Sequence, residues 1–336
     1  MITDSWKPPV LIISTSVGKG NVSVGEAVKG LFTAGINVEH IQIEELLPPN
    51  AVKEDLLRYK FISNNVPFLL NLVYRIPVFY YRKFIREKIF KTTDLKKLSQ
   101  TIQSLNIKTI ICISHRPTFW VYAVKARKGM DFDLWGVLTE FGQTLGWRYI
   151  FWNVMNGYIA PIEKNKLGYR FPPDIRYIVM EPFVHPDFYK LAESKSDINK
   201  VLFVAGYWGQ IFFNKAVKII LQIMKKIPQM QIIAVCGKNE ILLRRLMLYF
   251  KSYPDSRIKI YGETDSLLGI MKECSSIITK PGFSTIAEAH VAGRKIFLIK
   301  GMPVAEDNNA RHAIEYFDAS AFEIKDFLKW YNLNRQ

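Results

Sequence analysis

A short polar turn between an apolar run and a helix-forming stretch carries the residues best suited to chemistry in this sequence. Lys280 and Gly282 follow the apolar run, and Ser284 opens the stretch that continues to Glu288. Glycine lets the backbone turn sharply and approach a ligand closely. A helix that begins here presents unpaired N–H groups and the positive end of its dipole, which suit a diphosphate. Glu288, about one helical turn further on, can accept hydrogen bonds from a ribose diol.

An ordinary strand-to-helix turn capped by Ser284 explains the same residues, because short motifs also match by chance. The residues that follow favour ligand binding. A second apolar run ends near Ile299, and residues 301–310 then place Glu306, Asn308 and Asn309 close together. Adjacent carboxylate and amide side chains of this kind hydrogen-bond sugar hydroxyls.

The order of these segments, from TKPG through STIAEA to P-x-x-E-x-x-N, resembles the donor half of glycosyltransferase family 28. That family contains the monogalactosyl- and processive glucosyl-diacylglycerol synthases and the peptidoglycan enzyme that adds N-acetylglucosamine to lipid I. The resemblance is strongest to the glycolipid synthases and implies a UDP-sugar donor. Val304 and Ala305 replace the Gly and Gln of the synthases, which leaves the sugar open. The donor-binding residues that the resemblance implies are Gly206, Gly209, Tyr261, Lys280, Gly282, Phe283, Ser284, Thr285, Glu288, Glu306, Asn308 and Asn309.

The first half carries a loop that resembles the family's G-x-G-H segment near the acceptor. Its members here are Gly18, Gly20 and Asn21, so Asn stands where the family usually has His. An Asn side chain cannot take a proton, and another residue must act as the general base. Read without the family, this glycine spacing completes neither a dinucleotide fingerprint nor a P-loop.

Two titratable residues of the first half, His115 and Glu140, are the candidate catalytic groups. His115 follows an apolar run and resembles a THP-type segment of the glycolipid synthases, and Glu140 lies in a stretch resembling their threonine–aspartate segment. An imidazole accepts a proton readily near neutral pH. We expect His115 to be the base with Glu140 orienting it. Two alternatives stay open: Glu140 is itself the base, or His115 is bonded locally in a turn.

Basic charge is concentrated in one segment of the chain, whose formal net charge is +16. Residues 58–97 hold ten Lys or Arg against two acidic residues, interleaved with aromatic side chains. This mixture suits an anionic membrane surface, while a helix pair with solvated charges is the plainer alternative. No nucleic-acid motif accompanies the charge, and we expect no nucleic-acid partner. The expected membrane contacts are Arg75, Phe79, Tyr80, Arg82, Lys83 and Arg86.

Composition and cysteine use favour a globular protein without disulfides or a metal site. Of 336 residues, 49% are hydrophobic and 23% charged, enough for two domains with proper cores. Cys112, Cys236 and Cys274 lack metal-ligand spacing, and we expect buried free thiols in a reducing cytosol. Asp131 and Asp133 spell the D-x-D of metal-dependent glycosyltransferases, but this short match falls in the first half. We therefore expect no metal and no cofactor besides the donor substrate.

The amino terminus lacks the basic-then-apolar pattern of a signal peptide. No apolar run reaches the roughly 18 residues that span a bilayer. We expect a cytoplasmic protein that associates peripherally with the membrane.

Apolar runs of strand length alternate with helical patterns, which predicts an α/β fold with parallel sheets and crossover helices. The runs are residues 10–14, 38–43, 108–114, 135–138, 201–205, 232–236, 258–261, 276–279 and 295–299. The resemblance implies the GT-B architecture, two Rossmann-like domains facing each other across a cleft. We expect an acceptor and membrane-facing domain (1–195), a UDP-sugar-binding domain (196–318) and a tail (319–336). The polar stretch 193–200 forms the expected seam, and the tail is expected to cross back to the first domain as a helix.

The resemblance implies inverting, metal-independent transfer of a hexose from a UDP-sugar to a lipid acceptor at the cytosolic membrane face. Diacylglycerol and a lipid-linked sugar are the expected acceptor classes. One alternative is a sugar-nucleotide epimerase, which shares the architecture. Another is a non-catalytic subunit of a membrane glycosyltransferase complex that binds a nucleotide sugar, which Asn21 in place of His favours.

Overall fold

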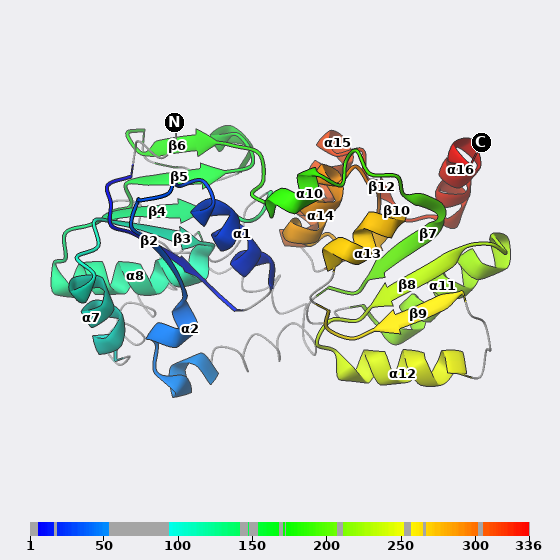
Figure 1. The fold of residues 1–336 in the computed structure, drawn as a ribbon, viewed down its shortest axis with the longest axis horizontal. Coiled ribbons are helices and arrows are strands. Elements are labelled where there is room, and N and C mark those ends of the chain that lie inside the picture. Colours follow the sequence, from blue (N-terminus) through cyan, green and yellow to red (C-terminus); the bar gives the residue numbers. More distant parts are fainter. Residues whose placement is uncertain are drawn as a thin grey trace. The chain divides into compact units, whose positions relative to one another are not determined.

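The computed structural model describes residues 6–16, 19–53, 94–141, 147, 154–167, 171, 173–206, 211–251, 257–264, 267–301 and 305–335. The chain divides into two compact units, unit 1 (Met1–Phe183 with Pro303–Ala305) and unit 2 (Val184–Met302 with Glu306–Gln336). Among the described residues each unit holds one parallel sheet of six strands with helices around it (Figure 1). The predicted α/β fold of two Rossmann-like units is confirmed.

The sheet of unit 1 has the strand order β2-β1-β3-β4-β5-β6, and its described pairings are all parallel. Its central strands are continuous aliphatic runs because both faces of a parallel sheet are covered. The strands are β1 (Val10–Ser14), β2 (Val38–Gln42), β3 (Thr109–Ile113), β4 (Asp133–Val137), β5 (Gly157–Ala160) and β6 (Arg176–Val179). The helices are α1 (Lys19–Lys29), α2 (Ile43–Leu46), α7 (Lys96–Ser104), α8 (His115–Lys128) and the 3-10 helix η4 (Lys164–Leu167).

The sheet of unit 2 has the order β12-β11-β10-β7-β8-β9 and is likewise parallel in its described pairings. Its strands are β7 (Asp197–Val204), β8 (Gln231–Val235), β9 (Ile258–Tyr261), β10 (Cys274–Thr279), β11 (Lys295–Leu298) and β12 (Ser320–Ala321). Its helices are α10 (Pro186–Tyr189), α11 (Phe213–Lys226), α12 (Glu240–Lys251), α13 (Leu267–Glu273), α14 (Phe283–Val291), α15 (Ala305–Tyr316) and α16 (Ile324–Asn334).

Strand order reverses direction once in each sheet, between β1 and β3 in unit 1 and between β7 and β10 in unit 2. In open parallel sheets, ligands bind outside the carboxyl ends of the strands at such a switch point. His115 directly follows the end of β3 in unit 1. Gly206 follows β7 and Lys280 follows β10 in unit 2. Topology therefore brings these candidate residues to the ligand-binding edge of their own sheets.

The unit boundary lies between Phe183 and Val184, earlier than the expected seam at 193–200. Half of that seam is the start of β7, which pairs with β10 from Asp197 onward. The polar residues of this strand end have partners: Lys200 Nζ lies 2.9 Å from Glu273 Oε2, and Asn199 Oδ1 accepts from the Tyr331 hydroxyl at 2.6 Å. A polar sequence is therefore compatible with a strand at this position.

The carboxyl-terminal tail, expected to cross back to the first domain, forms α16 and packs on unit 2. Phe327 and Tyr331 are buried in the core of that unit. The Tyr331 hydroxyl also accepts a hydrogen bond from Gln229 Nε2 at 2.7 Å. These contacts make the tail part of the second unit's fold.

No helix in the described part of the chain is long and apolar enough to cross a membrane. The residues expected to contact a membrane surface fall outside that part of the chain. They are Arg75, Phe79, Tyr80, Arg82, Lys83 and Arg86.

Candidate functional site

The predicted polar turn of unit 2 lies between the end of β10 and the start of α14. Gly282 is the N-cap residue of α14 in extended conformation, and no side chain caps the helix. Ser284 is inside the first turn, so the interpretation of Ser284 as a cap is wrong. The backbone N–H groups of Ser284 and Thr285 have no hydrogen-bond partner among the described residues. The amino end of α14 is therefore open to an acceptor, such as an anion, from outside the chain.

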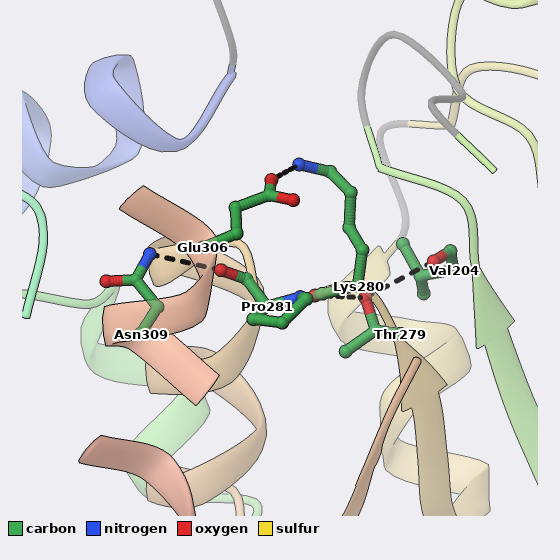
Figure 2. Close-up of polar contacts among 6 residues, drawn as sticks. All are labelled: Val204, Thr279, Lys280, Pro281, Glu306 and Asn309. Atoms are coloured by element: carbon green, nitrogen blue, oxygen red, sulfur yellow. Dashed lines mark hydrogen bonds and ion pairs between the residues drawn. The ribbon is translucent and has the colours of Figure 1, made fainter. Parts of the chain in front are cut away.

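Two side chains fix the backbone of this turn (Figure 2). The Thr279 hydroxyl lies 3.2 Å from the carbonyl of Val204, which joins the carboxyl ends of β10 and β7. Asn309 Nδ2 donates to the carbonyl of Pro281 at 3.0 Å, which ties α15 to the turn. Asn309 is fully buried, so its amide serves the protein's own backbone in this structure.

A buried ion pair spans the turn. Lys280 Nζ contacts Glu306 Oε1, and Figure 2 shows the lysine chain arching from the turn toward the carboxylate on α15. A Cβ on Gly206, whose φ is +82°, would lie 2.5 Å from Lys280 Cε. A Cβ on Gly301 would collide with the Glu306 carboxylate. These two glycines are required because the ion pair lies directly against their backbone.

Glu288 lies on α14, one turn beyond the open amino end. Its side chain is buried and has no hydrogen-bond or ion-pair partner among the described residues. Burial raises the pKa of Glu288 to about 8. A carboxyl group without a partner is costly to bury, and a strongly raised pKa of this kind marks a candidate functional site.

The other predicted donor residues are less tightly linked to the turn. Tyr261 ends β9 with an exposed side chain, and its carbonyl accepts from Cys236 N–H at 2.9 Å. Asn308 Oδ1 accepts from Arg311 at 2.7 Å. Phe283 is buried as the first residue of α14. Gly209 falls outside the described residues.

In unit 1, His115 and Glu140 follow the adjacent parallel strands β3 and β4, so both lie at the same edge of the sheet. His115 is the first residue of α8, and its ring centroid lies 6.3 Å from that of Trp147. Burial, with the nearby Arg116 charge, lowers the pKa of His115 to about 4. The imidazole is therefore neutral at physiological pH, and a weaker base than a free histidine.

The loop predicted to lie near the acceptor leads from β1 into α1, which begins at Lys19 and includes Gly20 and Asn21. Gly18 falls outside the described residues. Glu44, which the sequence analysis missed, anchors the start of this loop. Its carboxylate accepts from the Thr15 hydroxyl at 2.5 Å and from Ser16 N–H at 3.0 Å. The signal for Glu44 was its position just beyond β2, at the edge of the sheet where β1 also ends.

A small pocket opens beside this anchor, between α2, the residues that follow it and the start of α8. Most of its lining is apolar, and Arg116 lies next to His115 in the chain. The lining residues are Ile43, Glu44, Leu47, Ala51, Val52, Arg116 and Trp120. The site is thus apolar with two charged groups at the ligand-binding edge of unit 1.

The D-x-D match, Asp131 and Asp133, lies at the start of β4. Asp133 begins β4, at the end of the strand opposite the ligand-binding edge, and accepts from Asn156 Nδ2 at 2.8 Å. Within the described residues, no group of three or more His, Cys, Asp or Glu side chains is arranged to hold a metal ion. The cysteines Cys112, Cys236 and Cys274 are free and buried, as predicted.

Comparisons with known proteins give the chain its relatives. No family model matches it. The chain is 26% identical over 323 residues to the processive diacylglycerol beta-glucosyltransferase of Bacillus thuringiensis (strain Al Hakam), covering 91% of this chain and 79% of the relative.

Solved structures share the fold at low identity. UDP-GlcNAc 2-epimerase from Neisseria meningitidis, bound to UDP-GlcNAc, aligns with a TM-score of 0.59 at 11% identity, over 96% of this chain and 90% of that one. MurG from Acinetobacter baumannii aligns with a TM-score of 0.53 at 13% identity, over 96% and 89%. The resemblance predicted from the TKPG and STIAEA segments is confirmed: the chain has the GT-B fold and is similar over most of its length to the processive diacylglycerol glucosyltransferases.

Proposed function

We propose that this protein is a UDP-sugar-dependent hexosyltransferase whose acceptor is the hydroxyl group of a lipid. The named activity of the relatives that span 91% of the chain supports the reaction class. The observation that carries the donor assignment is Glu288, a buried carboxyl without a partner among the described residues, about one turn beyond a helix end that no side chain caps. Diacylglycerol and a lipid-linked sugar are the two acceptor classes.

The diphosphate of the donor binds at the amino end of α14. The N–H groups of Ser284 and Thr285, which have no acceptor in the described part of the chain, and the positive end of the helix dipole favour an anion there. Lys280 lies next to this position, with its ammonium group paired to Glu306. As the sugar leaves the diphosphate, these groups stabilise the negative charge that develops on UDP, the largest single contribution in many transfer reactions.

The ribose of the donor binds Glu288. In the free protein at neutral pH, burial keeps most of this carboxyl group protonated, because its pKa is about 8. Two ribose hydroxyls donating to the carboxylate stabilise the ionised form and lower this pKa. Binding of UDP is therefore coupled to release of a proton from Glu288.

The chemical step is a single displacement that inverts the anomeric carbon and uses no metal. His115 takes the proton of the acceptor hydroxyl, the acceptor oxygen bonds to the anomeric carbon, and the bond to the UDP oxygen breaks. Glu140 orients His115 from the neighbouring strand end. The apolar pocket beside Arg116 suits the hydrocarbon part of a lipid acceptor.

The reaction takes place at the cytosolic membrane face, with residues 58–97 as the membrane-binding segment. Its ten basic residues attract anionic lipid, each adding on the order of 1 kcal/mol near the surface. Changing Arg82, Lys83 and Arg86 to Glu releases the protein from anionic vesicles in this proposal. A variant that sediments with vesicles as the unchanged protein does would make the segment structural.

Incubation of the purified protein with several UDP-sugars and a membrane extract tests the reaction class. A lipid-bound sugar supports the transferase. A free, altered UDP-sugar supports the epimerase. The reaction product is needed for this decision, because a UDP-GlcNAc 2-epimerase has the same fold as the transferases. UDP binding with neither product supports a non-catalytic nucleotide-sugar-binding subunit.

A further inference from the structure

Helix α12 of unit 2 carries two apolar stripes, and only one is needed for folding. Leu242, Leu246 and Phe250 face inward and are buried in the core of the unit. On the outer side, Ile241 is 73% exposed and Leu248 is 70% exposed, and the two residues lie about two full helical turns apart. Exposed aliphatic side chains at helical spacing on one face indicate a contact surface rather than chance.

More side chains extend this surface. Met247 is 53% exposed beside Leu248, and Phe212, at the start of the neighbouring α11, is 72% exposed. Phe213 packs under the guanidinium of Arg245, 4.2 Å from its ring centroid, which brings the amino end of α11 to the middle of α12. The exposed fractions of Ile241, Met247 and Leu248 show that this side of α12, the lowest labelled helix of unit 2 in Figure 1, is open.

The charge of this surface is positive. Arg244, Arg245 and Lys251 lie on α12 against a single acidic residue, Glu240. The Arg244–Glu240 contact is 3.4 Å long between side chains that are both highly exposed, so it is weak and screened by salt. Basic residues mixed with exposed aliphatic and aromatic side chains match the composition of interfacial membrane-binding helices.

We propose that the outer face of α12, formed by Ile241, Arg244, Met247, Leu248 and Lys251, docks on an anionic phospholipid bilayer. The charge decides between occupants: an anionic lipid surface complements the face, whereas a second copy of this positively charged chain is repelled. The inference rests on the proposed lipid acceptor and deepens it. The unit that holds the UDP-sugar has a membrane contact of its own, independent of residues 58–97.

The buried native cysteines allow a site-specific test in the full chain. Cys112, Cys236 and Cys274 are buried, and burial raises the pKa of each thiol, so all three react slowly with labelling reagents. In the Leu248→Cys variant, an environment-sensitive fluorophore is attached at position 248, on the proposed surface. Leu333→Cys on α16 is the matched control, because Leu333 is also 70% exposed but is the only large exposed apolar residue on its described helix.

Each labelled protein is mixed with phosphatidylcholine vesicles with and without phosphatidylglycerol. We expect the label at 248 to shift to blue emission only with phosphatidylglycerol, and to revert in high salt, while the label at 333 stays unchanged. Ile241→Ser with Leu248→Ser should lower vesicle partitioning by about tenfold or more, whereas Leu333→Ser leaves it unchanged.

If the protein sediments with vesicles but the label at 248 keeps the emission spectrum that it has in water, the proposal is overturned, because another segment then makes the contact. A blue shift that grows with protein concentration without vesicles also overturns it, since a second copy then covers α12. UDP affinity, measured without vesicles, is unaffected by these variants. If the unchanged protein does not bind UDP, the proposed function is contradicted, but the fluorescence result for α12 still holds.

Discussion

Two acidic residues, Glu44 in unit 1 and Glu288 in unit 2, are held in opposite ways. In unit 1, Glu44 accepts from the Thr15 hydroxyl and from Ser16 N–H, so its carboxylate is used to hold the chain's own loop. In unit 2, Glu288 is buried without a partner among the described residues. The fold itself explains the satisfied carboxylate of Glu44, whereas the carboxyl group of Glu288 needs another explanation, which in our proposal is the ribose of the donor.

A second network in unit 1 supports the same contrast. His40 on β2 is buried, with Nε2 2.8 Å from the Ser14 hydroxyl and Nδ1 2.5 Å from Glu26 Oε1 on α1. Gly25 must be glycine here, because a Cβ would collide with the imidazole. The chain of three side chains resembles a catalytic triad in its order, but Ser14 is fully buried and cannot reach a substrate. It holds α1 against the sheet.

The largest effect is expected for His115, the group of unit 1 assigned to chemistry. His115→Ala should lower turnover about 10²–10⁴-fold, the usual loss of a general base, while UDP affinity is kept. Because burial and Arg116 lower the pKa of His115 to about 4, turnover of the unchanged enzyme should fall only as the pH drops through that value. Steady-state kinetics measured at intervals of about one pH unit, from roughly pH 3 to pH 8, give the loss of turnover in His115→Ala and the pH dependence of the unchanged enzyme.

His40→Gln is the matched control, since it changes a histidine of the same unit that has structural partners. This variant should lose stability and keep most of its turnover. Normal turnover in His115→Ala with loss in Glu140→Gln would make Glu140 the base. If neither change matters in an active enzyme, the catalytic assignment is wrong.

The ion pair between Lys280 and Glu306 is a contact of the unit 2 site that forms without a ligand. Lys280→Met leaves the buried Glu306 carboxylate without its ammonium counter-charge, which should lower the free energy of unfolding by about 3–5 kcal/mol. Adding Glu306→Gln should restore most of the stability, because the isolated charge is removed. Denaturant unfolding of both single variants and the double variant measures the coupling, and additive losses would contradict a direct ion pair.

Glu288 should make the protein less stable as the pH rises. Its pKa is about 8 in the folded protein, against 4.5 for the free group, so the unfolded chain loses this proton first. Stability contributed by the protonated group is complete below pH 4.5 and falls as pH rises toward 8, by a few kcal/mol in all. Glu288→Gln should flatten this part of the profile. Parallel pH profiles of the two proteins in thermal unfolding would contradict the isolated state of Glu288.

The smallest effect is expected for Glu44, the satisfied carboxylate. Glu44→Gln keeps one acceptor and weakens two hydrogen bonds, so the free energy of unfolding should drop by about 1 kcal/mol. UDP affinity should not change, because the donor residues lie in the other unit. A large loss of UDP affinity in a folded Glu44→Gln protein would contradict the proposed contrast, in which Glu44 holds the chain's own loop and Glu288 binds the ligand.

Most of the sheet framework could be predicted from the sequence, because continuous apolar runs mark buried parallel strands. The run at 10–14 corresponds to β1 and the run at 258–261 to β9. The strands β5, β6 and β12 were not predicted: β5 begins with glycine, β6 begins with a charged residue, and β12 is only two residues long. Gly157 is needed because a Cβ would collide with the ring of Trp135, a contact between distant residues that local patterns cannot reveal.

In the candidate site, too, local patterns could be predicted from the sequence and contacts between distant residues could not. Residue types and the turn between β10 and α14 could be predicted, since a strand, a glycine and a helix start are local signals. The pairing of Lys280 with Glu306 and the bond from Asn309 to Pro281 could not, because they join segments more than 25 residues apart. Nor could the isolation of Glu288, which depends on everything packed around it.

Calorimetry of UDP binding to the unchanged protein and to Glu288→Ala and Glu288→Gln tests the central claim most directly. The account predicts that Glu288→Ala weakens UDP binding by about 1–3 kcal/mol, the cost of losing hydrogen bonds to a charged group. Titrations at neutral pH in two buffers of different ionisation enthalpy should show more proton release for the unchanged protein than for Glu288→Gln. Equal UDP affinity and equal proton release in folded proteins would contradict the claim that Glu288 is held without a partner to bind the ribose.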